Sequence, residues 1–200
     1  MPFIMTKFEN SIASLVVRHG TENGWEYAAS LEGPNGPLLE IITEKRDDRA
    51  KPGLHVMDRA KAGARIVIHH NHLSKESLSQ ADWLGLIDAP FDEMHAHTAD
   101  GTHYWARILN CKAVRATAER WETLELDAMD AFSNSALQRY SGNSDPSGCS
   151  QFYRRHVIAK AMEQMNYVEY EFSWGTTLSG RSANFQAETN EAVQAIADQI

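Results

Sequence analysis

Two hundred residues, of which 42% are hydrophobic, suffice for one globular domain or one domain with an appended lobe, and they exclude wholesale disorder. Lys and Arg number 19 against 27 Asp and Glu, and this net charge of −8 disfavours nucleic-acid binding as the main activity. The longest apolar run, around residues 66–68, is far shorter than the ~20 residues of a membrane span, and residues 1–8 lack the plan of a signal peptide. We therefore expect a cytoplasmic protein with no membrane or nucleic-acid partner.

The chain is predicted to begin with an ambiguous segment and a hairpin. Residues 7–17 have a pattern that fits either a short helix or a strand. The turn-forming residues 33–36, Gly-Pro-Asn-Gly, separate two apolar runs at 25–31 and 38–43. These two runs are predicted to be paired strands, followed by a charged loop at 44–51.

Helices and strands then alternate up to residue 109. A helix that contains Met57 ends at Gly63, and the β-branched run 64–68 is typical of a buried strand. After a polar loop, a second helix runs from Ser79 to Pro90. A second hairpin, with strands at 93–98 and 103–109, turns at an Asp-Gly pair.

The spacing of the apolar residues changes after Cys111. Apolar residues recur at helical spacing up to Gly142, which predicts one long amphipathic helix. A hinge at 141–150, a helix at 151–165, a strand at 167–174 and a last helix from Ala183 complete the prediction.

Two histidines and an aspartate have the spacing of a metal site. His70 and His72 follow the predicted strand 64–68, and alternate residues of a strand point to one side. Asp82 falls in the first turn of the next helix and can return a carboxylate to the same point. Two imidazoles and one carboxylate suit tetrahedral Zn²⁺ with a water as fourth ligand, which is the plan of a catalytic site.

Simpler interpretations exist for the same residues. Ser79-x-x-Asp82 is also a helix capping box, although capping and metal binding are compatible. His69 points to the other face of the strand and is expected to be either a core histidine or one that supports a metal ligand from behind. His95 and His97 repeat the spacing of alternate residues, so a second metal site there is a less favoured alternative, with His103 in the same hairpin.

The pattern HNH-x6-S-x-x-D after a hydrophobic strand resembles the signature of the JAMM (MPN-plus or JAB) zinc metalloproteases. The resemblance covers about residues 22–109 and implies that His70, His72 and Asp82 bind zinc. It implies that Ser79 stabilises an oxyanion and that an upstream glutamate activates water. Glu26, 44 residues before His70, is the best match for that glutamate.

Two details differ from the commonest family pattern, and two other glutamates compete with Glu26. The spacer before Ser79 has six residues rather than the family's usual seven, and Leu73 stands where the family has proline. Glu32 and Glu40 are the competing candidates for the base.

Other chemistries have weaker support in the sequence. A Ser/His/Asp hydrolase lacks the G-x-S-x-G elbow, and a thiol protease that pairs His156 with Cys111 or Cys149 rests on residue types alone. The aromatic run at 167–174 is expected to be strand core or an interface.

The sequence thus predicts an α/β fold: a mixed sheet of the JAB/MPN (cytidine-deaminase-like) type flanked by helices, at residues 1–111, with a mainly helical extension at 112–200. The resemblance implies a zinc-dependent peptidase or isopeptidase that acts on a protein or peptide, such as a ubiquitin-like tail. The alternatives are an inactive binding module of the same fold and an accessory protein of DNA processing or mobile elements. The C-terminal helices are a candidate surface for a homodimer.

Overall fold

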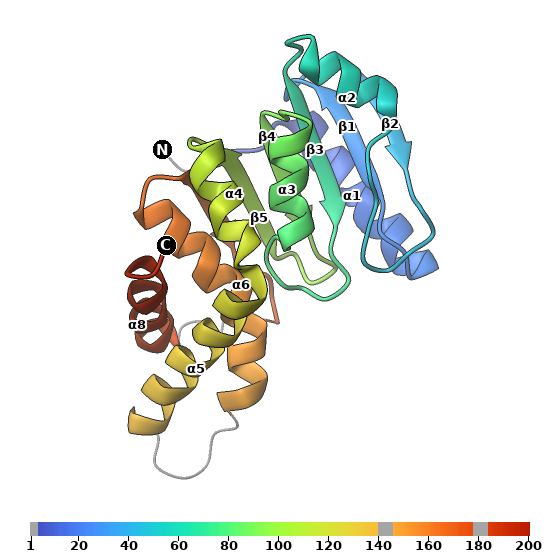
Figure 1. Cartoon of the computed structure of the whole chain (residues 1–200). Helices are drawn as coiled ribbons and strands as arrows, with labels where there is room; N and C mark the ends of the chain where they lie inside the picture. The colour runs from blue at the N-terminus through green and yellow to red at the C-terminus, as the bar shows by residue number, and fades with distance from the viewer. Residues whose placement is uncertain (1–3, 140–145, 178–183) are drawn as a thin grey trace.

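The fold is a mixed six-stranded sheet with helices on both faces and a helical lobe at one end (Figure 1). The computed structural model describes residues 4–139, 146–177 and 184–200. The strand order is β2-β1-β3-β4-β5-β6, and only β3 and β4 run parallel among the described strands. The predicted α/β class, with a mixed sheet and a helical C-terminal part, is confirmed.

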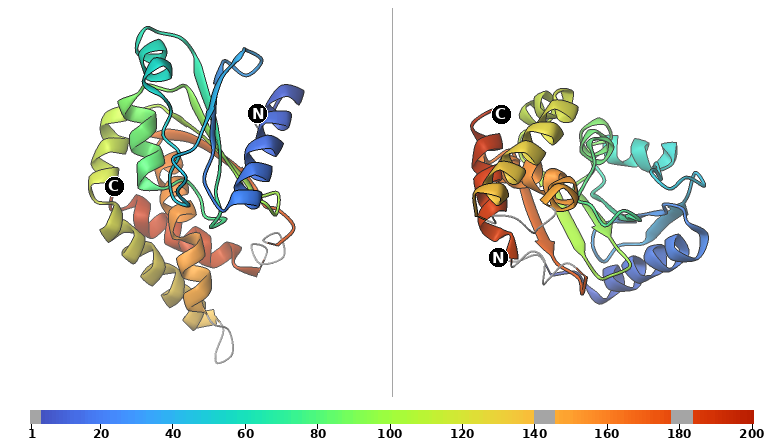
Figure 2. Two further views of the ribbon diagram at one scale, coloured as in Figure 1. Left: turned by 90° about the vertical axis from the view of Figure 1, so that its right-hand side faces the viewer. Right: turned by 90° about the horizontal axis from the view of Figure 1, so that it is seen from below.

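The ambiguous N-terminal segment is a helix, α1 (Lys7–Asn23). Thr6 and Glu9 form a capping box at its start, and Gly24 ends it in the left-handed region, with φ of 68°. The helix covers one face of the sheet, where Ile12 and Val16 pack on apolar residues of β1 and β3. Figure 2 shows α1 alone on this side and the helices α2, α3 and α4 on the other.

The two predicted hairpins are present. Strands β1 (Ala28–Glu32) and β2 (Leu38–Ile42) pair antiparallel, as do β4 (Glu93–His97) and β5 (His103–Ile108). The helix α2 (Leu54–Lys61) precedes β3 (Ile66–Asn71). The helix α3 (Gln80–Asp88) then connects β3 to the parallel strand β4. The C-terminal end of β3 therefore meets the N-terminus of α3, which is where open α/β sheets commonly bind ligands.

The C-terminal part differs from the prediction in two places. The long helix expected up to Gly142 is two helices, α4 (Cys111–Glu119) and α5 (Trp121–Arg139), separated by a tight turn at Arg120. The helix α6 (Pro146–Gln164) begins inside the segment expected to be a hinge, whose residues 141–145 lie outside the described residues. Apolar periodicity continues across Arg120 and so does not reveal the break.

The last elements add to both the lobe and the sheet. The strand β6 (Val168–Ser173) pairs with β5, and α8 (Gln186–Ala197) packs against α5 and α6. The expected start of the last helix at Ala183 lies outside the described residues. The division of the chain at residue 111 stays a prediction, and β6 from the second part completes the sheet of the first. In the part of the chain that is described, no helix combines the length and apolarity needed to cross a bilayer.

Candidate metal centre

The side chains of His70, His72 and Asp82 come together at the C-terminal end of β3. The Nε2 atoms of the two histidines are 2.8 Å apart, and each lies 3.4 Å from an oxygen of Asp82. The two imidazole planes are inclined by 67° with ring centres 4.6 Å apart, and both Nε2 atoms face one region beside Asp82. One ligand atom from each residue lies within 4.8 Å of the others, so the group is geometrically able to hold a metal ion.

Backbone contacts explain why the two histidines point the same way. His70 is in β3, and the backbone N–H of His72 donates to His97 O at 2.8 Å, which extends the pairing with β4 past the end of the strand. The ring Nδ1 of His72 lies 2.9 Å from Glu76 O. A hydrogen bond at one ring nitrogen fixes the tautomer and directs the other nitrogen, here Nε2, toward the site.

Asp82 is held by the capping box that the sequence predicts. Its Oδ2 accepts hydrogen bonds of 2.7 Å from both the backbone N–H and the hydroxyl of Ser79. Oδ1 remains on the side of His70. Helix capping and convergence of the three side chains therefore occur together, and Ser79 places its hydroxyl at the edge of the site.

Glu26 is buried beside this group, with Oε1 3.9 Å from Nε2 of His72. It lies before β1, which begins at Ala28, so the strand expected from residue 25 starts three residues later. The other glutamates considered are engaged elsewhere: Glu32 pairs with Arg59, and Glu40 accepts a 2.7 Å hydrogen bond from Gly53 N.

Asn71, the middle residue of the HNH run, anchors the backbone around Glu26. Its Oδ1 accepts from Tyr27 N at 2.8 Å, and its Nδ2 donates to Trp25 O at 3.2 Å. Helix α1 leaves room for this side chain at Gly20, where a Cβ would lie only 2.1 Å from Nδ2. The asparagine thus fixes the residues on both sides of Glu26, a role that its position in the motif did not reveal.

We expect Asn71→Ala to lower the free energy of unfolding by about 1–3 kcal/mol, because it leaves the part-buried backbone groups of Trp25 and Tyr27 without these partners. Urea denaturation of the metal-free protein measures this change. Asn23→Ala is the matched control, because Asn23 makes only an exposed hydrogen bond to His19 O. Equal stabilities of the two variants would contradict the anchoring role.

The helical lobe also supports the loop that orients His72. The carboxylate of Glu76 pairs with Arg154 at 2.8 Å and with Arg155 at 2.9 Å, both from α6. The next residue, Ser77, shares a 2.8 Å hydrogen bond with the hydroxyl of Tyr170 in β6. These contacts join residues about 80 to 90 positions apart, and no local pattern predicts them.

Burial and neighbouring charges set the protonation of the group. Burial lowers the pKa of His70 to about 4. Burial also opposes the charge on His72, but contact with the Asp82 carboxylate prevails and raises its pKa to about 9. Burial alone would raise the pKa of Asp82, yet the two histidines and Ser79 hold it below its usual range. A cation that binds here must therefore displace the proton of His72, so binding weakens in acid.

The carboxyl of Glu26 differs from that of Asp82. Burial raises the pKa of Glu26 to about 7, and the nearby charge of His72 only partly opposes this effect. Two carboxyl groups in one site are thus pushed in opposite directions. Such separation is typical of sites in which one carboxylate binds and the other exchanges a proton.

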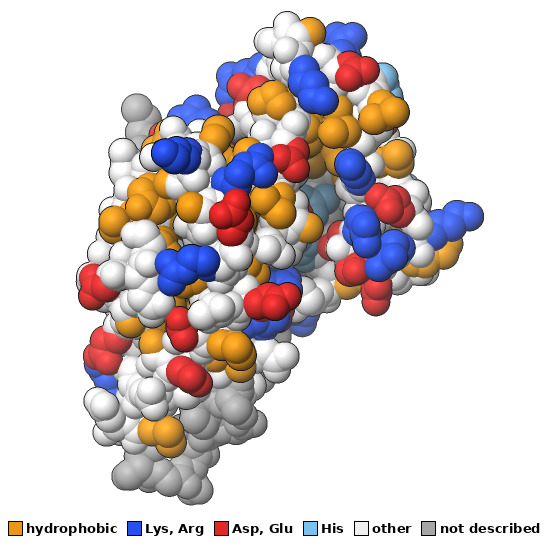
Figure 3. Space-filling model, in the orientation of Figure 1, with side chains coloured by type: hydrophobic (Ala, Val, Ile, Leu, Met, Phe, Trp, Pro, Cys, Tyr) orange, Lys and Arg blue, Asp and Glu red, His pale blue; other side chains and the backbone are white. Residues whose placement is uncertain are grey.

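A cavity of about 320 Å³ opens next to His70, Asp82 and Glu26. Its apolar part is formed by Met57, Ile68, Phe91 and Met94, all on the side of α2 and α3. Figure 3 shows histidine surface at the bottom of this hollow, with charged side chains on one rim. A ligand in this cavity can therefore reach His70, Asp82 and Glu26 along an apolar wall.

Comparison with family models, with curated proteins and with solved structures found no match to this chain.

Proposed function

We propose that this protein is a zinc-dependent hydrolase that cleaves an amide or isopeptide bond of a peptide or protein with an activated water. The observation that carries this proposal is the convergence of His70, His72 and Asp82 beside a separate buried carboxylate, Glu26. The position of this group at the end of β3 also favours the JAB/MPN type of α/β fold that the HNH-x6-S-x-x-D pattern resembles.

The donor set fits zinc. Two imidazole nitrogens and one carboxylate oxygen are ligands that Zn²⁺ accepts, and three protein ligands leave a position open for water or substrate. When bound, the ion supplies Lewis acidity, which makes a water acidic and polarises the substrate carbonyl. The role of the chain is to hold the ion through His70, His72 and Asp82. Glu76 O fixes the orientation of His72, and Ser79 fixes that of Asp82.

Glu26 is the proposed general base and acid. Its carboxylate lies on the His72 side of the group, separate from the three ligands, where it can take and return a proton. Burial raises its pKa to about 7 in the metal-free protein. It accepts a proton from the attacking water and delivers that proton to the leaving amine. Hydrolysis then takes place in one displacement, without an acyl-enzyme.

Ser79 is the proposed donor to the developing oxyanion. Its hydroxyl is half-buried at the edge of the site and donates to Asp82 Oδ2 in this structure. Rotation about one side-chain bond redirects the same proton toward a substrate oxygen. A preorganised donor of this kind stabilises the charge that forms as water attacks the carbonyl.

The experiment that tests this function is a cleavage assay on zinc-loaded protein. The substrates are a library of linear peptides and a set of isopeptide-linked peptides, with products identified by mass spectrometry. We expect products that differ from substrate by one water, lost on chelation and restored by zinc. Absence of cleavage by protein that demonstrably carries zinc would contradict the proposal.

The cavity beside the group favours substrates with an apolar side chain next to the cleaved bond. Gly85 of α3 lines it, and a Cβ at this position would meet only Met94 Cε, at 3.9 Å. Gly85→Leu is therefore expected to fill the cavity and raise the Michaelis constant for such substrates roughly tenfold or more. Gly85→Ala is the control, since it adds one methyl group without strain. Unchanged kinetics in Gly85→Leu would show that substrate does not use this cavity.

A further inference from the structure

A second group of histidines lies on the opposite face of the sheet, under α1. His69 of β3 pairs in register with His95 of β4, and His97 of β4 pairs with His103 of β5. His69 and His95 are fully buried, and His97 is 5% exposed. This face is the one that His69 was expected to occupy, away from His70 and His72.

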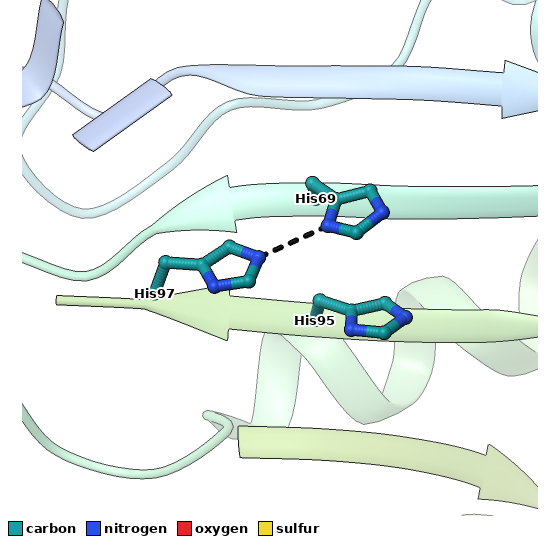
Figure 4. Close-up of side chains that lie close together, drawn as sticks. All are labelled: His69, His95 and His97. Atoms are coloured by element: carbon teal, nitrogen blue, oxygen red, sulfur yellow. Dashed lines mark hydrogen bonds between the residues drawn. The ribbon is translucent and has the colours of Figure 1, made fainter. Parts of the chain in front are cut away.

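Nitrogen atoms of three of these rings lie close together (Figure 4). His69 Nδ1 is 3.0 Å from His97 Nε2, and His95 stacks on His69 with ring centres 4.2 Å apart. Each of the three offers a ring nitrogen within 4.8 Å of the others. In tetrahedral zinc sites with Zn–N bonds of about 2.0–2.1 Å, neighbouring nitrogens are about 3.3 Å apart. The spacing of His69 and His97 already approaches this value.

The ring orientations show what would change when a cation binds. His69 and His97 are nearly parallel, inclined by 8°, and lie end to end across a hydrogen bond. A cation would replace the proton that these two nitrogens share, with a turn of both rings about their side-chain bonds. His95 would turn further, from stacking on His69 to directing a nitrogen at the same point. His103 Nε2, 3.1 Å from His95 Nδ1, is the nearest imidazole for a fourth position.

A buried carboxylate stands behind His69. Glu9 is fully buried, its Oε2 accepts a 2.7 Å hydrogen bond from Thr6 N, and its Oε1 lies 3.7 Å from His69 Nε2. Neither Glu9 Oε1 nor His69 Nε2 has a hydrogen-bond partner among the described residues. A proton on His69 Nε2 is directed at Glu9 and leaves Nδ1 free to bind a cation. A carboxylate behind a histidine in this way is a regular feature of metal ligands.

The charge balance also favours a cation. Burial disfavours the charged form of an imidazole, and the neutral form of His95 and His97 carries the lone pair that a cation needs. Glu9 supplies a negative charge that offsets part of the cost of placing a cation in the interior. Imidazole ligands favour zinc, copper or nickel over magnesium or calcium.

We propose that His69, His95 and His97 form a second metal site, which binds a divalent transition-metal ion such as Zn²⁺ in the interior between the sheet and α1. His69 and His95 are fully buried on the face of the sheet that α1 covers, so the ion would stabilise the fold rather than take part in hydrolysis. This site does not depend on the function proposed for the first group.

The test is a count of zinc per chain in tag-free, full-length protein after equilibration with zinc and removal of excess ion. We expect two ions in the wild type and one in the double variant His70→Ala/His72→Ala, which lacks the first site. Adding Glu9→Gln to that variant should lower the affinity for the remaining ion by about 10–100-fold while the fold, followed by circular dichroism, is kept. His55→Gln, which changes an exposed histidine that belongs to neither group, should still bind two ions.

A zinc-free double variant that is folded would overturn this second site and leave the first untouched. The second site would also be overturned if the double variant kept one ion and Glu9→Gln did not change the affinity for that ion. Conversely, one ion in the double variant but no peptide cleavage by the wild type would overturn the hydrolase function and leave the second site standing.

Discussion

Glu26→Gln is expected to reduce the rate of peptide hydrolysis by roughly 10²–10⁴-fold, the usual contribution of a positioned general base. The amide has nearly the same shape as the carboxylate but cannot take a proton from water. Because Glu26 is not one of the three residues that can hold the ion, the zinc content should be unchanged. Steady-state kinetics together with elemental analysis of the same preparation measures both quantities.

Glu40→Gln is the matched control for this variant. Glu40 is a competing candidate in the sequence, but in the structure it accepts a hydrogen bond from Gly53 N, at a distance from the three ligands. It should therefore keep the wild-type rate. A Glu26→Gln variant that binds zinc and hydrolyses peptides as fast as the wild type would exclude Glu26 as the base.

The dependence of kcat/KM on pH should report the ionisation of Glu26. Burial raises the pKa of Glu26 to about 7 in the metal-free protein, and a nearby cation would lower it by favouring the charged form. A general base acts in its deprotonated form, so kcat/KM should fall as the pH is lowered through the pKa of Glu26 in the zinc-loaded protein. The residual activity of Glu26→Gln should lack this limb of the profile.

Ser79→Ala is expected to have the second largest effect, on two quantities at once. Loss of an oxyanion donor lowers kcat by about 10²–10³-fold. Loss of the N-cap of α3 lowers the free energy of unfolding by about 0.5–2 kcal/mol, because Asp82 N loses its side-chain partner. Kinetics of the zinc-loaded protein and urea denaturation of the metal-free protein measure the two changes separately.

Thr6→Ala separates capping from catalysis. Thr6 forms the same type of capping box with Glu9 at the start of α1, on the other face of the sheet. This variant should lose a similar amount of stability and keep the wild-type kcat. If Ser79→Ala behaves in the same way as Thr6→Ala, the hydroxyl of Ser79 acts only as a helix cap.

The local parts of the site could be predicted from the sequence. The i, i+2 spacing of His70 and His72 is enough to place both rings on one side, since strand geometry has a period of two. The Ser79-x-x-Asp82 pattern marks the start of α3 because it satisfies the free backbone N–H groups of a helix N-terminus. The hydrophobic run before His69 is typical of a buried strand, and β3 is buried throughout.

Contacts between distant segments could not be predicted in this way. The anchoring of Trp25 and Tyr27 by Asn71 depends on the antiparallel pairing of β1 with β3, which a single sequence does not specify. The support of Glu76 by α6 likewise depends on how the lobe packs against the sheet. The apolar pattern does not predict the break at Arg120, because α4 and α5 together continue a pattern that a single helix would also show.

The histidines under α1 illustrate the same limit. Sequence spacing relates His95 to His97 and leaves His69 as an isolated core residue. The parallel register of β3 and β4 places His69 beside His95 and so assembles a group from two strands. Only the arrangement of strands in the sheet reveals that three imidazoles and Glu9 share one buried space.

The most direct test of this metal centre is the zinc content of the wild type compared with that of His70→Ala, measured by elemental analysis after identical equilibration. Convergence of His70, His72 and Asp82 on one cation predicts that the variant binds one zinc ion fewer per chain than the wild type. An identical zinc content in the two proteins, both folded, would contradict the assignment of these three side chains as a metal centre.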